Sequence, residues 1–171
     1  MTEYSRRSML CTTVAGLSGG LAPALYAGDK RAPAPKFQVD DTRVISHLTH
    51  RYHGWPTLAR RRNGQLLLVC SGGRESHVCP FGRVELMRSD DGGAHWSWPQ
   101  TLIDSAIDDR DAGGLETPGG SLLVTTFTSL AFEQPTYFPK SDAQKVARWI
   151  AARDRVPETT RKKMLGAWII R

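Results

Sequence analysis

The 171-residue sequence is poor in several features that would assign a protein to a class at once. It has only three cysteines and 8% aromatic residues, and its His, Cys and Asp residues show no metal-ligand spacing. Its N-terminal apolar stretch, Cys11 to Leu25, is too short and too rich in glycine for a membrane span. The sequence therefore predicts no metal, no cofactor and no stable membrane span.

The charge balance is basic, but it carries no sign of nucleic-acid binding. The formal net charge is +6, and basic residues gather at Arg60–Arg62 and toward the C-terminus. No RNA- or DNA-binding motif and no interleaved aromatic side chains accompany them, which indicates solvated faces and no nucleic-acid partner. A positive field also suits an anionic sugar. The apolar content of 40% is normal for a globular protein.

The N-terminus has the pattern of a twin-arginine export signal. The pair Arg6-Arg7 precedes a short apolar region that ends in small residues. We expect residues 1–27 to be the signal, residues 28–36 to be a linker, and the protein to be periplasmic or extracellular. An unstructured basic tail is the alternative. In an oxidising compartment Cys70 and Cys79 either form a disulfide or remain two buried thiols.

The most specific stretch is Ser89–Trp96, which follows an apolar-alternating run at residues 82–88. Alternation that meets Asp-Asp-Gly-Gly and then an aromatic residue predicts a strand, a tight turn and a return strand. A calcium loop would need a closing Glu at its twelfth position, where Thr101 stands. The stretch therefore indicates a structural hairpin.

The remaining pattern predicts four antiparallel strands within residues 52–104 and a second, similar set from residue 108. Asn63-Gly64 lies between two apolar runs and is a strong hairpin signal. Placing Gly64 on Gly120 gives an offset of about 56 residues, and placing Arg88 on Arg171 gives an offset of about 83. The sequence therefore predicts an internal repeat with an insertion of about 27 residues in its second copy.

The predicted insertion, at about residues 141–165, is helical. Residues 141–153 have helical spacing, with Ser141 as N-cap and Val146, Trp149 and Ile150 on one face. A second short helix is predicted from Pro157 to 164, with the proline at its first position. We expect Trp149 and Ile150 to dock the insertion on the sheets.

The spacing of Ser89, Asp91, Gly93 and Trp96 resembles the structural Asp-box of sialidases and related β-propellers. His95 stands where that family more often has Thr. The resemblance extends over about residues 51–171, with further matching segments at 54–58, 63–67, 73–74 and 108–111. It implies an all-β fold, a sialidase-type six-bladed β-propeller. Of this propeller, residues 37–171 supply about the first two blades, one at about 52–104 and one from about 108. We expect the chain to be a truncated piece, because it stops one residue before the expected second box.

Exo-α-sialidases of this family hold the sugar carboxylate with three Arg and use an Asp acid/base with a Tyr nucleophile paired with Glu. Here Trp55 lies in the segment that replaces the family's Arg-Ile-Pro, and residues 81–83 replace the acid/base Asp. Arg74 matches the family's Arg that follows the second strand and faces the sugar. The Tyr, its Glu and the later two Arg would lie in blades outside this chain.

The residues that remain suggest a modified site. The repeat places Arg110-Asp111 where Gly54-Trp55 stands in the first copy, near the mouth of the propeller. We expect substrate binding by Asp109, Arg110 and Asp111 together with Arg74 and Trp55; a solvated turn, or core packing for Trp55, is the alternative. Glu75 and His77 are the candidate catalytic acid/base pair, with surface residues as the alternative.

Two functions follow from this pattern. The first is an exported sialidase-like glycoside hydrolase that acts on terminal sialic acid or another acidic sugar. The second is a non-catalytic β-propeller that binds a glycan or an envelope partner. Both predict a sialylated or acidic glycan as the ligand, and the sequence leaves catalysis open.

Overall fold

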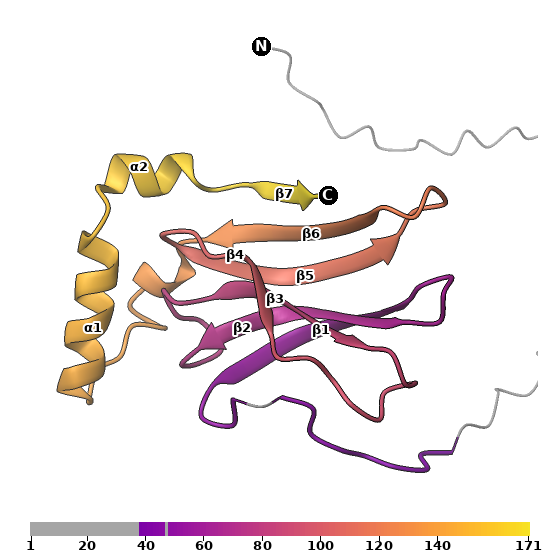
Figure 1. Ribbon diagram of the computed structural model, residues 1–171. Helices are drawn as coiled ribbons and strands as arrows, with labels where there is room; N and C mark the ends of the chain where they lie inside the picture. The colour runs from indigo at the N-terminus through magenta and orange to yellow at the C-terminus, as the bar shows by residue number, and fades with distance from the viewer. Residues whose placement is uncertain (1–37, 47) are drawn as a thin grey trace, which may run out of the picture. The chain divides into compact units, whose positions relative to one another are not determined.

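The computed structural model describes residues 38–46 and 48–171 (Figure 1). The predicted export signal at 1–27 and linker at 28–36 lie outside the described residues. The chain divides into two units, Met1–Thr42 and Arg43–Arg171, and only residues 38–42 of the first are described. Within the described part, every helix is too short or too polar to cross a membrane.

The second unit is mostly β-structure, built from two antiparallel sheets and short helices (Figure 1). The first sheet has the order β1-β2-β3-β4 and the second has the order β5-β6-β7. The strands are β1 (Tyr52–Arg60), β2 (Leu66–Arg74), β3 (Arg83–Ser89), β4 (Gln100–Ile103), β5 (Asp108–Glu116), β6 (Leu122–Ser129) and β7 (Ala167–Ile170). Between β6 and β7 lie the 3-10 helix η1 (Ala131–Glu133), α1 (Ala143–Asp154) and α2 (Glu158–Lys163). The two sheets and the helical insertion agree with the sequence prediction.

The strand register confirms both predicted offsets. In the first sheet Leu68 of β2 lies opposite Met87 of β3, and in the second Val124 of β6 lies opposite Ile170 of β7. The offset of about 56 residues carries Leu68 to Val124, and the offset of about 83 carries Met87 to Ile170. The central part of the second sheet therefore repeats the register of the first three strands, while the pairing at the start of β5 differs by one residue from that at the start of β1.

The repeat extends to an unusual backbone feature. Among the described residues, only Trp55 and Asp111 have a positive φ without being glycine, with values of 49° and 52°. Each lies where the pairing of its strand with the next one slips, in β1 and in β5. A bulge of this kind redirects the side chains of its strand. The positive φ at its centre is uncommon for a residue that has a Cβ atom. The predicted equivalence of Gly54-Trp55 and Arg110-Asp111 is confirmed.

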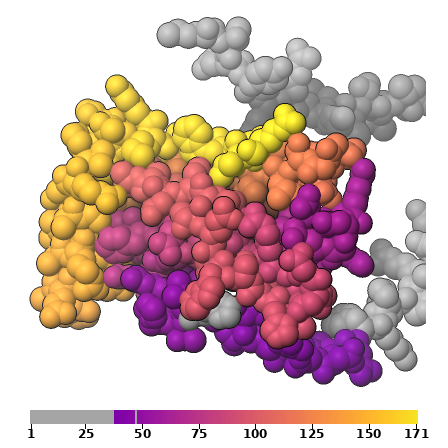
Figure 2. All heavy atoms as spheres, viewed as in Figure 1, coloured from indigo at the N-terminus to yellow at the C-terminus, as the bar shows by residue number. Residues whose placement is uncertain are grey.

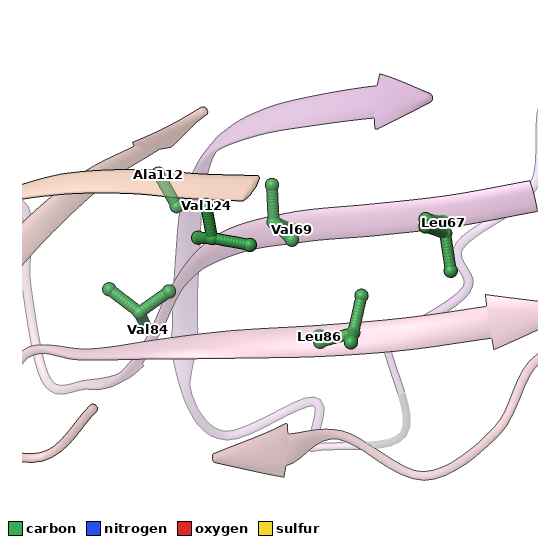
Figure 3. Packing of buried hydrophobic residues seen from close by; sticks show 6 residues of the cluster. All are labelled: Leu67, Val69, Val84, Leu86, Ala112 and Val124. Atoms are coloured by element: carbon green, nitrogen blue, oxygen red, sulfur yellow. The ribbon is translucent and has the colours of Figure 1, made fainter. Parts of the chain in front are cut away.

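The main core lies between the two sheets (Figure 3). Aliphatic side chains from both sheets meet there and exclude water, which is the main favourable term in folding. Polar contacts add to it: Thr57 Oγ1 donates a hydrogen bond of 2.9 Å to the Ala112 carbonyl, and Arg61 pairs with Glu116 at 3.1 Å. The buried residues of this core are Leu67, Val69, Val84, Leu86, Ala112 and Val124.

The insertion docks through Trp149, as predicted. Its side chain is 1% exposed and packs in a second core cluster with Val78, Ile107 and Phe132. Ile150, by contrast, is 38% exposed, so its predicted docking role is wrong. The insertion lies at the end of the sheets where β1 and β5 begin (Figures 1 and 2).

The helix starts differ from the prediction by one residue each. Asp142, not Ser141, caps α1, because its carboxylate accepts a 2.9 Å hydrogen bond from the Lys145 backbone N–H. Pro157 occupies the N-cap position of α2 instead of the first helical position. Asp and Ser are both good N-caps, so the residue types alone do not decide which of these two neighbours caps the helix.

The stretch after β3 forms a closed network of hydrogen bonds that links β3 to β4. Ser89 Oγ donates to Asp91 Oδ1 at 2.9 Å and accepts from the Gly93 N–H at 2.9 Å, while Trp96 Nε1 donates to the Gly93 carbonyl at 3.1 Å. His95 Nδ1 lies 2.6 Å from Asp91 Oδ2, so His fills the position that Thr more often holds. Hydrogen bonds from His95 lower the pKa of Asp91. The predicted structural hairpin is confirmed, although β4 begins at Gln100.

Replacing Ser89 by Ala should lower the free energy of unfolding by about 1 kcal/mol, because one buried hydroxyl makes two of these hydrogen bonds. Urea unfolding followed by circular dichroism measures the change. Ser141→Ala is the control, because this exposed hydroxyl caps no helix. Equal stability of both variants would contradict the role of the network.

Candidate functional site

Several predicted site residues meet around the ring of Trp55, at the end of the sheets where β1 and β5 begin. The His77 ring centroid lies 4.8 Å from that of Trp55, and the Arg110 guanidinium carbon lies 4.8 Å from the Trp55 centroid. Tyr52 adds a ring at 6.0 Å. We call these residues, together with Asp111, the Trp55 cluster: Tyr52, Trp55, His77, Arg110 and Asp111.

Arg74 lies beneath this cluster and does not reach solvent. Its two terminal nitrogens bind the two oxygens of Asp108 at 2.7 and 2.9 Å, and both side chains are 0% exposed. Further hydrogen bonds reach the carbonyls of His77 and Asp109, at 2.8 and 3.3 Å. Nη2 donates a hydrogen bond to Asp108 Oδ2, while Nη1 makes an ion-pair contact with Oδ1, so these contacts use the donors that a sugar carboxylate would need. In the structure Arg74 supports the cluster from below, whereas the sequence predicted that it faces the ligand.

Arg110 is also largely buried, with a side chain 10% exposed, but its charge is only loosely compensated. Its Nη1 lies 3.7 Å from Asp108 Oδ2 and its Nε lies 3.9 Å from Asp111 Oδ1, both beyond hydrogen-bond distance. Arg110 Nε and Asp111 Oδ1 are buried and have no hydrogen-bond partner. The guanidinium stacks on Trp55 and on Phe127, at 4.8 and 5.9 Å. Cation–π contacts with two aromatic rings therefore help to hold it in place.

Asp111 is the carboxylate of the cluster that reaches solvent, with a side chain 38% exposed. Its backbone N–H donates a 2.8 Å hydrogen bond to Ser71 Oγ on β2, which fixes the bulge. His77 is also exposed. These two groups and the exposed phenol of Tyr52 are the side chains of the cluster that an incoming ligand can meet beside Arg110.

Glu75 and His77, the predicted acid/base pair, lie in different surroundings. The carboxylate of Glu75 is bound by Arg148 Nε at 3.1 Å and by Trp149 Nε1 at 3.2 Å, both from α1. Its side chain is 18% exposed. Glu75 therefore ties the loop after β2 to the insertion, whereas His77 packs against Trp55 with the two rings tilted by 55°.

Asp109 is fully buried behind the cluster instead of lining it. Its two oxygens accept hydrogen bonds from the backbone N–H and the hydroxyl of Ser105, at 2.6 and 3.0 Å. Burial raises the pKa of Asp109 to about 6 against these hydrogen bonds. The structure places Asp109 as a support of the β4–β5 connection.

Sequence reasoning missed two supporting residues. Asp108 carries the buried ion pair with Arg74, and Gly82 leaves room for it, because a Cβ atom there would collide with Asp108 Oδ1 and Arg74 Nη1. The run of three acidic residues around Arg110 held a signal for Asp108. Nothing local distinguishes Gly82 from an ordinary loop glycine.

The cysteines take no part in a bridge. Cys70 and Cys79 are both free and buried, so the alternative of two buried thiols is confirmed and the disulfide is wrong. Burial, and secondarily the charge of Glu85, raises the pKa of the Cys70 thiol to about 12. Within residues 38–46 and 48–171, no three His, Cys, Asp or Glu side chains are placed to hold a metal ion.

Comparisons with known proteins give distant structural similarity only. No protein-family model and no curated protein matches the chain. A crystal structure of a protein of unknown function from Dyadobacter fermentans DSM 18053 aligns with a TM-score of 0.47 and 20% identity, covering 58% of this chain and 30% of that one. The Hadza microbial sialidase Hz136 aligns with a TM-score of 0.39 and 18% identity, covering 46% and 20%. Similarity this weak leaves fold and activity to be argued from the residues.

The substitution Gly82→Ala should destabilise the protein by about 3–5 kcal/mol, the usual cost of breaking a buried ion pair, because the methyl group would force Arg74 and Asp108 apart. Urea unfolding measures the loss. Gly119→Ala is the matched control, because a Cβ atom there meets only one side-chain oxygen at 4.0 Å. A loss as small as in the control would show that the pair tolerates displacement.

Asp109 should make the protein less stable as the pH rises from about 4 to about 6. Its folded-state pKa of about 6 lies above the ordinary value of 3.8, so in this range the folded state binds the proton more tightly than the unfolded state. Asp109→Asn cannot titrate and should reduce this decline, measured by urea unfolding at about pH 4 and pH 6.5. The exposed Asp90, changed to Asn, should leave the decline intact. An unchanged slope in Asp109→Asn would contradict the assignment.

Proposed function

We propose that this chain forms part of an exported sialidase-like β-propeller that binds an acidic sugar at the Trp55 cluster. The propeller part of the proposal is supported by the repeated antiparallel sheets, which pack face to face, and by the hydrogen-bonded hairpin at Ser89–Trp96. Propellers place their ligand sites where the blades meet around one axis. The Trp55 cluster joins β1 of the first sheet to β5 of the second.

The single observation that carries the ligand assignment is the state of Arg110. Its guanidinium contacts the rings of Trp55 and Phe127, while its carboxylate neighbours stay 3.7 and 3.9 Å away. A sugar carboxylate would supply the close, charge-assisted hydrogen bonds that Asp108 and Asp111 do not make. The exposed ring of Tyr52 would take the apolar face of the sugar ring.

Binding is supported better than hydrolysis. Sialidases differ from most glycosidases because they combine one acid/base carboxylate with a Tyr nucleophile, so the cluster would have to supply at least a free acid/base carboxylate. In the cluster Asp111 is the exposed carboxylate, whereas Glu75 is held by Arg148 and Trp149 and Asp109 is buried. The geometry therefore favours a non-catalytic glycan-binding site, with the glycosidase as the second candidate.

Arg110→Ala should weaken the binding of N-acetylneuraminic acid by the full chain at least tenfold, or about 1.4 kcal/mol, in isothermal titration calorimetry. Binding of the corresponding sugar without its carboxylate should not change. Arg60→Ala removes the same charge from an exposed position at the other end of β1 and is the control. Absence of saturable binding to any acidic sugar, or equal affinity of Arg110→Ala and the native chain, would overturn the proposal. Release of a fluorogenic sialoside would identify the protein as the hydrolase instead.

A further inference from the structure

The loop that carries His77 also borders a second, strongly charged hollow. The hollow has a volume of about 360 Å³ and opens to solvent. Its walls come from the residue before β1, from β2 and β3 with the loop between them, from the loop after β4, and from α1 and the residue that follows it. Its charged lining residues are Arg51, Glu75, Arg83, Asp104, Arg148 and Arg155.

Two of the four arginines are already engaged. Arg148 pairs with Glu75 at 3.1 Å, and Arg83 pairs with the buried Glu85 at 2.6 Å. These ion pairs fix the walls of the hollow, and the charge of each of the two arginines is compensated by its partner. Because Glu75 also accepts from the indole of the buried Trp149, α1 is fixed against the loop after β2.

The other two arginines, Arg51 and Arg155, are exposed and face the hollow. Among the described residues neither side chain has an ion-pair or hydrogen-bond partner, and Asp104 is the remaining acidic group of the lining. Two guanidinium groups around a preformed hollow suit a carboxylate, because each presents a planar fork of donors. The fixed walls reduce the ordering cost of binding.

The hollow and the Trp55 cluster lie close enough for one ligand. Glu75 and Arg51 line the hollow, while His77 and Tyr52 belong to the cluster, and two residues of extended chain span at most about 7 Å. The neighbour of an acidic sugar bound at the cluster would therefore lie on the side of the hollow, whose lining includes Arg51 and Arg155. A ligand with a single charged sugar would leave the hollow unused.

We propose that the helical insertion builds a second anion subsite, so that the chain binds an oligosaccharide with a carboxylate on more than one sugar. This inference rests on the proposed function, since it places one of those sugars at the Trp55 cluster. The insertion supplies Arg148 to the wall, and Arg155 follows α1 directly. The first sheet has a short loop between β2 and β3, whereas the second has the helical insertion between β6 and β7. The residues that the insertion adds to the subsite therefore have no counterpart in the first copy of the repeat.

The experiment compares tetragalacturonate with monomeric galacturonate by isothermal titration calorimetry on the full chain. The native protein should bind the tetramer more tightly, and increasing salt should reduce the difference. The double variant Arg51→Ala/Arg155→Ala should bind the tetramer about tenfold more weakly and the monomer unchanged. Arg60→Ala/Arg62→Ala removes two exposed arginines at the β1–β2 turn and is the matched control.

Each of the other outcomes overturns either the second subsite or the proposed function. Equal affinity for tetramer and monomer, or a double variant that matches the control, overturns the second subsite while the Trp55 cluster stands. If binding of the tetramer depends on Arg51 and Arg155 but not on Arg110, the proposed function is overturned and the second subsite stands. Absence of binding to both galacturonates overturns the second subsite, while the titration with N-acetylneuraminic acid decides the proposed function separately. Circular dichroism of the exposed-residue variants should match the native chain, which separates binding loss from unfolding.

Discussion

The buried ion pair between Arg74 and Asp108 is the constraint on which the candidate site depends. It joins the end of β2 to the start of β5, so it links the two sheets where both bulges lie. A buried pair of this kind contributes little net stability, because desolvation offsets most of the attraction. Its effect is on geometry. With Arg74 and Asp108 fixed, Trp55 and Arg110 stack above them, and Asp108 is kept too far from Arg110 to neutralise it fully.

The internal repeat explains why the site is asymmetric. One backbone device, a bulge with a left-handed residue, occurs in β1 and in β5. The first copy places an aromatic ring there, Trp55, and the second places a carboxylate, Asp111, beside Arg110. A repeated scaffold therefore presents unlike side chains to one point. The first copy thus supplies an aromatic ring and the second supplies the guanidinium of Arg110, and an acidic sugar can use both kinds of group.

The helical insertion is held on the sheets by both apolar and polar contacts. It is anchored by apolar burial of Trp149 and by a polar tie to Glu75, so its position is well determined. Arg161 adds a third anchor, since its buried side chain binds Glu133 at 2.6 Å and the carbonyl of Arg153 at 2.7 Å. These contacts keep α1 and α2 on the sheets. The charged residues that remain exposed on this segment are therefore presented from a rigid wall.

Much of the fold was readable from the order of residues, because its signals are local. Strand alternation, the turn at Asn63-Gly64 and the spacing from Ser89 to Trp96 depend on neighbours in sequence, and they placed the sheets, the repeat and the hairpin correctly. The partners of charged side chains are not local. Arg74 is buried against Asp108, 34 residues away, and Glu75 is bound by Arg148, 73 residues away. Sequence spacing could identify these residues as chemically capable. Only the packing of the two sheets and the insertion decided which of them stay available to a ligand, because burial and pairing are set by contacts between distant segments.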